Sequence, residues 1–332
     1  MVGYHQKRGH RPLLGSVAAL LVCVLLASVV QGKPQNGPVV LPTVTPTPPV
    51  ADVSFPTVES DAPYSKAESL PEEEETVSAA EEGDPVVERT MYGGQAVAAF
   101  FVQDSTGAGL DLEEELQQDP EISVQTGGDP MVLIYHTHTT ECFLPAFTGY
   151  ITEADPVRTL DETKNMVAVG ERIAEVLTAR GIGVVHDKTV HDHPAYTGAY
   201  DRYWETIQKN LERYPSIVMT IDVHRDAMVA EDGTAYKPTA EVGGQKAAQI
   251  MIITGRDPDG SYGFPNWRKN LHMALQLQQC ASEKYGELMR PLNFCDRRYN
   301  MNATVNSLLV EVGTHVNTLD EALYSAVYLA ML

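Results

Sequence analysis

Residues 131–141 read Met-Val-Leu-Ile-Tyr-His-Thr-His-Thr-Thr-Glu, and the prediction of the fold starts from this stretch. Its first half, Met131–Tyr135, is a short apolar run that fits a buried strand. Its second half is polar and places two histidines and a glutamate directly after that strand. In open α/β sheets, ligands bind where the carboxyl ends of the strands meet, so the stretch predicts a strand that leads into a functional site.

Downstream of this stretch, strand-type runs alternate with amphipathic helices. Apolar residues recur at helical spacing from Met166 to Leu177, and Gly181 stands where a C-cap glycine belongs. Thr318 and Glu321 have the spacing of a capping box, which predicts the start of the last helix. The other expected helices run through Ile207 to about Pro215 and from Trp267 to Tyr285, and the other expected strands cover residues 183–185, 216–223, 248–254 and 307–312.

This alternation predicts an α/β fold in which a mostly parallel or mixed sheet is flanked by helices. The pattern starts at Gly127, so we expect one domain over residues 127–332. A domain of about 200 residues can bury a full hydrophobic core.

The N-terminus has the pattern of a membrane anchor. Leu13–Val30 is an apolar run of 18 residues, and basic residues precede it. That length is at the lower limit for a helix that spans a bilayer, and the positive flank places the N-terminus in the cytoplasm. The alternative is a cleaved signal peptide, but the run is long for one and Ala27–Val29 is a poor cleavage site. We therefore expect residues 1–33 to be a single-pass signal anchor in the cell membrane, with the rest of the chain on the extracytoplasmic side.

Residues 34–126 have the composition of a linker. The first part is rich in proline, which favours extended conformations, and the second part is acidic. The segment contains few large apolar residues, and their burial cannot offset the conformational entropy that the chain would lose on folding. We therefore predict a disordered tether. Two short stretches within it, Tyr92–Val102 and Leu110–Leu116, are apolar enough to dock onto the domain or bind a partner.

Charge and motifs exclude several classes of function. The chain has a net charge of −21, whereas a nucleic-acid-binding protein is expected to carry a basic patch. The sequence contains no G-x-x-x-x-G-K-[ST] phosphate loop and no G-x-S-x-G nucleophile elbow. Nucleic-acid binding, P-loop chemistry and serine-hydrolase chemistry therefore have no support.

Residues able to bind a metal ion stand at the ends of three expected strands. His138 and Glu141 follow the first, His224 follows the strand over 216–223, and Glu311 ends the apolar run of the last. A catalytic zinc ion takes three His or carboxylate ligands, and amide hydrolysis also needs a general base. His138, Glu141 and His224 are therefore candidate ligands of Zn²⁺, and Glu311 is the candidate base. Each histidine taken alone could be an ordinary loop residue. The occurrence of His and Glu together at the ends of three strands favours a metal site.

Several motifs in this part of the chain are shared with a known family. They are Leu133–Glu141, Asn165–Asp192, Ile221–Ala227 and Leu309–Gly313, followed by Asn317. In this order they closely resemble the stage II sporulation protein P family, from about Asp129 to the C-terminus. The expected anchor and spacer also match the layout of that family. The resemblance implies a zinc-dependent N-acetylmuramoyl-L-alanine amidase, which cleaves peptidoglycan between N-acetylmuramic acid and the L-alanine of the stem peptide. It also implies that an endopeptidase activity is possible.

The resemblance also implies roles for single residues. His138 and His224 match the histidines that hold zinc in those amidases, and Glu311 matches the catalytic glutamate. Glu141 fits the sporulation motif as the second ligand, whereas Glu162 stands where the wider amidases place theirs. We favour Glu141.

Four further residues near these motifs are candidates for a part in the site. Arg225 is a candidate for a catalytic contact with a substrate carboxylate or an oxyanion. His136, Cys142 and His186 lie close enough to matter, and the motifs leave their roles open.

Two other functions remain open from the sequence. One is a zinc carboxypeptidase or endopeptidase that acts on stem peptides, and the other is a non-catalytic cell-wall-binding module. A binding module has no need of a base, so Glu311 argues against the second. By resemblance, the expected partners are the peptidoglycan substrate, a lytic transglycosylase and a membrane protein of the engulfment complex.

Overall fold

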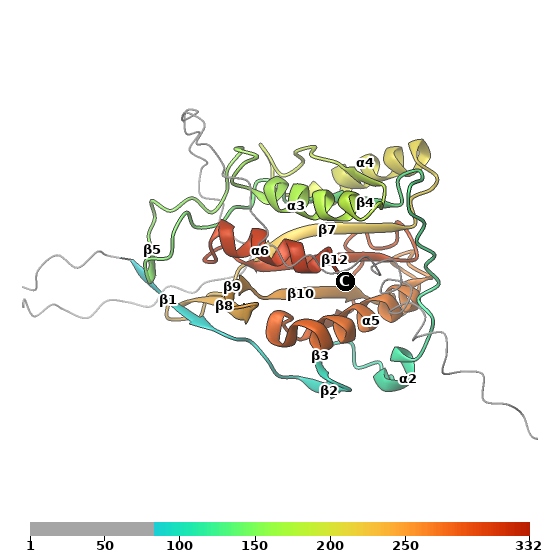
Figure 1. Ribbon diagram of the computed structural model, residues 1–332, viewed down its shortest axis with the longest axis horizontal. Coiled ribbons are helices and arrows are strands. Elements are labelled where there is room, and N and C mark those ends of the chain that lie inside the picture. The colour runs from blue at the N-terminus through green and yellow to red at the C-terminus, as the bar shows by residue number, and fades with distance from the viewer. Residues whose placement is uncertain (1–82) are drawn as a thin grey trace, which may run out of the picture. The chain divides into compact units, whose positions relative to one another are not determined.

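The computed structural model describes residues 83–332, coloured from cyan to red in Figure 1. At its centre is an eight-stranded sheet, whose strands are β2 (Gln95–Val97), β3 (Phe100–Asp104), β4 (Val132–Tyr135), β6 (Val184–His186), β7 (Met219–Asp226), β10 (Ile250–Gly255), β11 (Leu292–Cys295) and β12 (Ser307–Thr314). Their order is β2-β3-β11-β10-β12-β7-β4-β6. β12, β7, β4 and β6 are parallel, whereas β10 is antiparallel to β12. The sheet is therefore mixed, as the sequence predicts.

Side chains alternate between the two faces of β4, and each face has its own core. Val132 and Ile134 join the larger core, which the sheet forms with three helices. Leu133 and Tyr135 point to the opposite face and pack against Tyr203 of a fourth helix. The three helices are α3 (Met166–Ala179), α5 (Trp267–Tyr285) and α6 (Leu319–Leu329), and the fourth is α4 (Ala199–Arg213). In Figure 1, α3, α6 and α5 lie one below another.

A second, smaller sheet lies beside the first one. Its order is β5-β1-β8-β9, for β5 (Tyr150–Ile151), β1 (Asp84–Arg89), β8 (Ala235–Val242) and β9 (Gln245–Ala248). The ammonium group of Lys237 on β8 is buried and donates to Glu88 at 2.9 Å and to Glu321 at 2.6 Å. This charge cluster connects β1 to β8 and to the first turn of α6.

The fold begins before the predicted boundary at residue 127, so the predicted linker is wrong for the described part of residues 34–126. β1 is a central strand of the smaller sheet, and β3 pairs with β11 at the edge of the larger one. Phe100, Val102 and Leu112 are buried in the larger core, and a short helix, α2 (Leu112–Leu116), packs there too. These few apolar residues cannot form a core of their own, but they need only cover one that already exists.

The other predictions for the N-terminal part lie outside the described residues. They concern the signal anchor over residues 1–33, with its helix at 13–30, and the linker over residues 34–82. No helix within residues 83–332 is long and apolar enough to cross a bilayer.

Candidate active site

His138 lies in a buried turn directly after β4. All residues of His136–Glu141 are at most 7% exposed. The backbone N–H of Thr137 donates to the Asp222 carboxylate at 2.9 Å, and its hydroxyl donates to the same carboxylate at 2.6 Å. These bonds attach the turn to β7 and fix the position of His138.

His224 and Glu311 are direct neighbours on two parallel strands. The register of β7 and β12 pairs His224 with Glu311, and side chains at paired positions point to the same face. Tyr135, which packs against α4, pairs with Asp222, two residues before His224. All four side chains therefore share the face of the sheet that α4 covers.

Two histidine rings meet at this edge of the sheet. The rings of His138 and His224 lie edge to face with their centroids 5.2 Å apart. Glu141 Oε2 lies 3.5 Å from His224 Nδ1, and Asp222 Oδ1 lies 2.8 Å from His224 Nε2. The structure thus brings together His138, Glu141, His224 and, through the strand register, Glu311.

The two histidines have opposite electrostatic environments. Burial lowers the pKa of His138 to about 4. Burial also acts to lower the pKa of His224, but the Asp222 and Glu141 carboxylates outweigh it and raise that pKa well above its ordinary value. His138 is therefore a neutral ligand-type imidazole, whereas His224 is held between two carboxylates.

Two arginines lie beside Glu141. Arg158 lies 3.4 Å from Glu141 Oε1, and Arg225 lies 3.8 Å from the same oxygen. Burial alone would raise the pKa of Glu141, but the charge of Arg225 and the hydrogen bond with His224 lower it well below its usual range. Glu141 is therefore a carboxylate throughout the physiological pH range.

Glu311 has the opposite character. Its Oε2 atom is buried and has no hydrogen-bond partner among residues 83–332. Burial raises the pKa of Glu311 to about 8, although the charge of His224 opposes this shift. A carboxyl group that titrates near neutral pH suits a general base or acid.

The side chains at this site are of the chemical types that bind zinc. Within residues 83–332, no three His, Cys, Asp or Glu side chains are already spaced as a metal cluster. However, Nδ1 of His138 is buried and makes no hydrogen bond there, and an unpaired buried nitrogen is costly unless something binds it. Two imidazoles and a carboxylate are also the ligand types of catalytic zinc. His138, Glu141 and His224 are the residues that would hold the ion.

Comparison with known sequences identifies the family. A model of the family "Stage II sporulation protein P (SpoIIP)" matches residues 48–332. The chain belongs to this family. The stage II sporulation protein P of Bacillus subtilis is 28% identical over 220 residues, which cover 63% of this chain and 51% of that protein. The matched part therefore spans about half the length of that relative.

Solved amidase structures resemble this SpoIIP chain more distantly. The N-acetylmuramoyl-L-alanine amidase AmiC2 of Nostoc punctiforme is 13% identical with a TM-score of 0.34, over 62% of this chain and 96% of that one. The CwlD amidase of Clostridioides difficile, solved with the GerS lipoprotein, is 11% identical with a TM-score of 0.37, over 60% of this chain and 94% of that one. Function therefore has to be argued from the site.

Glu162 and Arg225 are the other two residues that the sequence offered for this site. Glu162 is exposed in the turn before α3, whereas Glu141 is buried beside His224. The guanidinium of Arg225 donates to the backbone carbonyls of Cys142 at 3.2 Å and Val157 at 2.7 Å. In this arrangement Arg225 positions Glu141 and the neighbouring loop, while its predicted contact with substrate stays a prediction.

The residues with open roles lie beside the site and not in it. His136 and His186 point to the opposite face of the sheet, under α3, where their Nε2 atoms are 2.9 Å apart. The Cys142 thiol is buried and donates to Pro156 O at 3.0 Å, and burial raises its pKa to about 11. Cys142 is therefore a packed thiol.

No pattern in the sequence indicates the aromatic side chains that line the site. Tyr196 stacks on His138 with centroids 4.4 Å apart, and the Arg158 guanidinium lies 4.8 Å from the Tyr196 ring. Tyr200 meets the His138 ring edge to face at 5.5 Å and lies parallel to the His224 ring at 6.4 Å. Tyr196 and Arg158 come from irregular loops, where no periodicity indicates which side chains turn inward.

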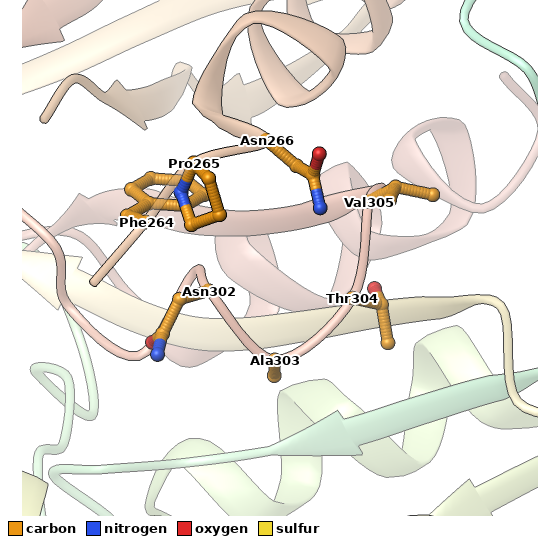
Figure 2. Close-up of a pocket in the computed structure, with 7 residues that line it drawn as sticks. All are labelled: Phe264, Pro265, Asn266, Asn302, Ala303, Thr304 and Val305. Carbon is orange, nitrogen blue, oxygen red and sulfur yellow. The ribbon is translucent and has the colours of Figure 1, made fainter. Parts of the chain in front are cut away.

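A small pocket at the other end of β12 is separate from this site. It has a volume of about 130 Å³ and is lined by Phe264, Pro265, Asn266 and residues 302–305. Figure 2 shows these side chains around the start of α5 and the loop that leads into β12. These residues precede β12, whereas Glu311 lies within it, and none of them belongs to the candidate active site.

Proposed function

We propose that this SpoIIP chain is a zinc-dependent N-acetylmuramoyl-L-alanine amidase, a peptidoglycan hydrolase of sporulation. The observation that supports this most is the pairing of Glu311 with His224 beside His138. It puts an unpaired carboxyl group next to two imidazoles at the carboxyl ends of three parallel strands. Family membership supplies the substrate class, and the site supplies the hydrolytic chemistry.

A zinc ion in this site would polarise a carbonyl group and make water more acidic. His138, Glu141 and His224 hold the ion in the proposal. Asp222 lies 2.8 Å from Nε2 of His224 and orients its imidazole, as carboxylates beside metal-binding histidines commonly do. Arg225 and His224 lower the pKa of Glu141, so that it is ionised and can bind a cation.

Glu311 moves the proton in the proposed reaction. Its carboxylate accepts a proton from the attacking water, while the water oxygen forms a bond to the amide carbonyl carbon. The protonated Glu311 then gives that proton to the amide nitrogen as the carbon–nitrogen bond breaks. The products are the free carboxylic acid of the muramic acid lactyl group and stem peptide with a free L-alanine amine. Glu311 ends the cycle as it began.

The remaining parts of the proposal concern the setting of the enzyme. We propose a membrane anchor at residues 13–30, which holds the catalytic domain on the extracytoplasmic side of the cell membrane. The proposed partners are a lytic transglycosylase and a membrane protein of the engulfment complex. The motifs of the family and the apolar run near the N-terminus support these proposals.

The test is to identify the bond that the protein cleaves. The chain, loaded with zinc, is incubated with purified peptidoglycan and the products are analysed by mass. Release of intact stem peptides that begin with L-alanine is the expected result. Release of shortened stem peptides would indicate a carboxypeptidase or endopeptidase instead, and peptidoglycan binding without any cleavage would indicate a binding module.

A further inference from the structure

Tyr200 stands over both histidines of the candidate site. It lies in the first turn of α4, after Gly198, whose φ of 80° starts the helix. Its ring contacts His138 edge to face and lies parallel to His224. The two rings fix the direction of the tyrosine, so its hydroxyl has a defined place over the edge of the sheet.

The loop between β11 and β12 holds Tyr200 in place. The Asn300 side chain donates from Nδ2 to the backbone carbonyl of Tyr200 at 2.9 Å, and the Tyr299 ring lies 5.5 Å from the Tyr200 ring. Tyr299 and Asn300 adopt φ values of 42° and 57°. Two consecutive non-glycine residues in this region are uncommon, and such strain is concentrated at functional sites. The loop therefore keeps a strained backbone conformation, and in that conformation it contacts Tyr200.

The Tyr200 hydroxyl is available as a donor. The bond from Asn300 reaches the backbone carbonyl of Tyr200. The Tyr200 hydroxyl makes no hydrogen bond within residues 83–332. A tyrosine hydroxyl carries a proton that it can donate in a hydrogen bond.

The cationic side chains of the site are engaged elsewhere. Arg158 binds Asp192 at 2.8 Å and Glu141 at 3.4 Å, and Arg225 donates to two backbone carbonyls. In this structure both guanidinium groups are already paired with groups of the protein. Hydrolysis of an amide nevertheless puts a negative charge on the carbonyl oxygen, and enzymes place fixed donors against it.

We propose that Tyr200 is a further catalytic residue, whose hydroxyl donates a hydrogen bond to the scissile carbonyl oxygen as that oxygen becomes negative. Asn300 is its positioning residue. The inference rests on the proposed amidase function. A donor that acts on charge present only in the transition state raises kcat and leaves KM almost unchanged.

The test is Tyr200→Phe in the full chain, which removes the hydroxyl and keeps the ring stacked on the histidines. The control is Tyr214→Phe, the same change at the end of α4 away from the site. Removal of one oxyanion donor typically costs about 10²–10³-fold in rate. We expect a fall of that size in kcat on a soluble muramoyl peptide, with KM and bound zinc unchanged. Tyr214→Phe should behave as wild type.

A second pair of variants tests the positioning. Asn300→Gly removes the side-chain bond but tolerates the positive φ, so kcat should fall less than in Tyr200→Phe. The double variant should be no slower than Tyr200→Phe alone, because both changes act through one hydroxyl. A lower kcat in the double variant would contradict the assigned positioning role.

The outcomes separate this inference from the function on which it rests. If wild type releases stem peptides and Tyr200→Phe has a normal kcat, the amidase stands and the role of Tyr200 is wrong. Loss of zinc in Tyr200→Phe, or a rise in KM alone, would also overturn that role. If wild type cleaves no muramoyl–alanine bond, the proposed function and the role of Tyr200 both fail.

Discussion

Two pairs of histidines lie on opposite faces of the sheet, and they differ in one respect. In the pair under α3, His136 Nδ1 meets Val223 O at 2.9 Å, its Nε2 meets His186, and His186 Nδ1 meets Glu171 at 3.1 Å. Every ring nitrogen there has a partner. In the pair under α4, Nδ1 of His138 is buried without one.

The difference shows that burial alone does not distinguish a structural histidine from a functional one. All four imidazoles are largely buried, and His136 and His138 are only two residues apart. A satisfied pair stabilises the fold, because its hydrogen bonds replace those lost to water. An unsatisfied pair costs stability unless a ligand completes it, so the face under α4 is the one on which a function can be argued.

The largest expected effect comes from breaking the α4-side pair. His138→Ala and His224→Ala should each abolish zinc binding and hydrolysis, because a site with two remaining ligands loses most of its affinity. Metal content after dialysis and peptidoglycan release are the measurements. His186→Ala is the matched variant on the other face, and folded protein of that variant should keep its zinc. Equal zinc loss in His186→Ala would remove the distinction between the two pairs.

The second prediction identifies the carboxylate ligand. Glu141→Ala should lose zinc and activity, because Glu141 is buried beside His224 and carries its charge there. Glu162→Ala should bind zinc and cleave as wild type does, since Glu162 is exposed in a turn. Zinc titration of the two variants decides between them, and loss of zinc in Glu162→Ala alone would reverse the assignment.

The third prediction targets the pair under α3. A Cβ atom added at Gly170 would lie 2.5 Å from His136 Nε2 and 2.6 Å from His186 Nε2. Overpacking of a core costs about 1–3 kcal/mol, so Gly170→Val should lower the free energy of unfolding by at least that amount. Ala179→Val, at an exposed position of the same helix, is the control. Urea unfolding measures both, and an unchanged midpoint for Gly170→Val would show that the rings can move aside.

The smallest effect is a dependence of stability on pH. Burial, together with the charge of His186, lowers the pKa of His136 to about 3. As pH falls below about 6.5, the unfolded chain takes up a proton at this residue while the folded protein does not, so the free energy of unfolding decreases. One such group contributes about 1.4 kcal/mol per pH unit between pH 6 and 4. His136→Asn should reduce the slope by about that amount in urea titrations at several pH values, and an unchanged slope would contradict the lowered pKa.

Local patterns in the sequence predict β4, β6, β7, β10 and β12 of the larger sheet and the helices α3 to α6, but not β2, β3 or β11. α5 has the predicted bounds, Trp267–Tyr285, and the Thr318–Glu321 capping box starts α6. β8 was missed because Ala235–Val242 contains a proline and several polar residues, and it is held by pairing with β1 about 149 residues away. Such long-range pairing leaves no periodic signal in either segment.

The residues of the site also fall into two groups, those that the sequence predicts and those that it does not. His138, His224 and Glu311 could be predicted because each stands at the end of an apolar strand, and parallel strands carry their ends to one edge. Tyr200 and Arg158 could not, since the turn of α4 and the loop around Arg158 are placed by tertiary contacts. The sequence thus predicts the residues on the sheet, and the structure adds those that close over it.

We propose that Glu311 is the base beside a zinc ion held by His138, Glu141 and His224. The decisive variant is Glu311→Gln, because the amide keeps the size of the side chain and removes its ability to take a proton. We expect wild-type zinc content and a rate of peptidoglycan cleavage about 10²–10⁴-fold below wild type. Loss of zinc from Glu311→Gln would make Glu311 a ligand, and retained zinc with a near-normal rate would show that another group is the base.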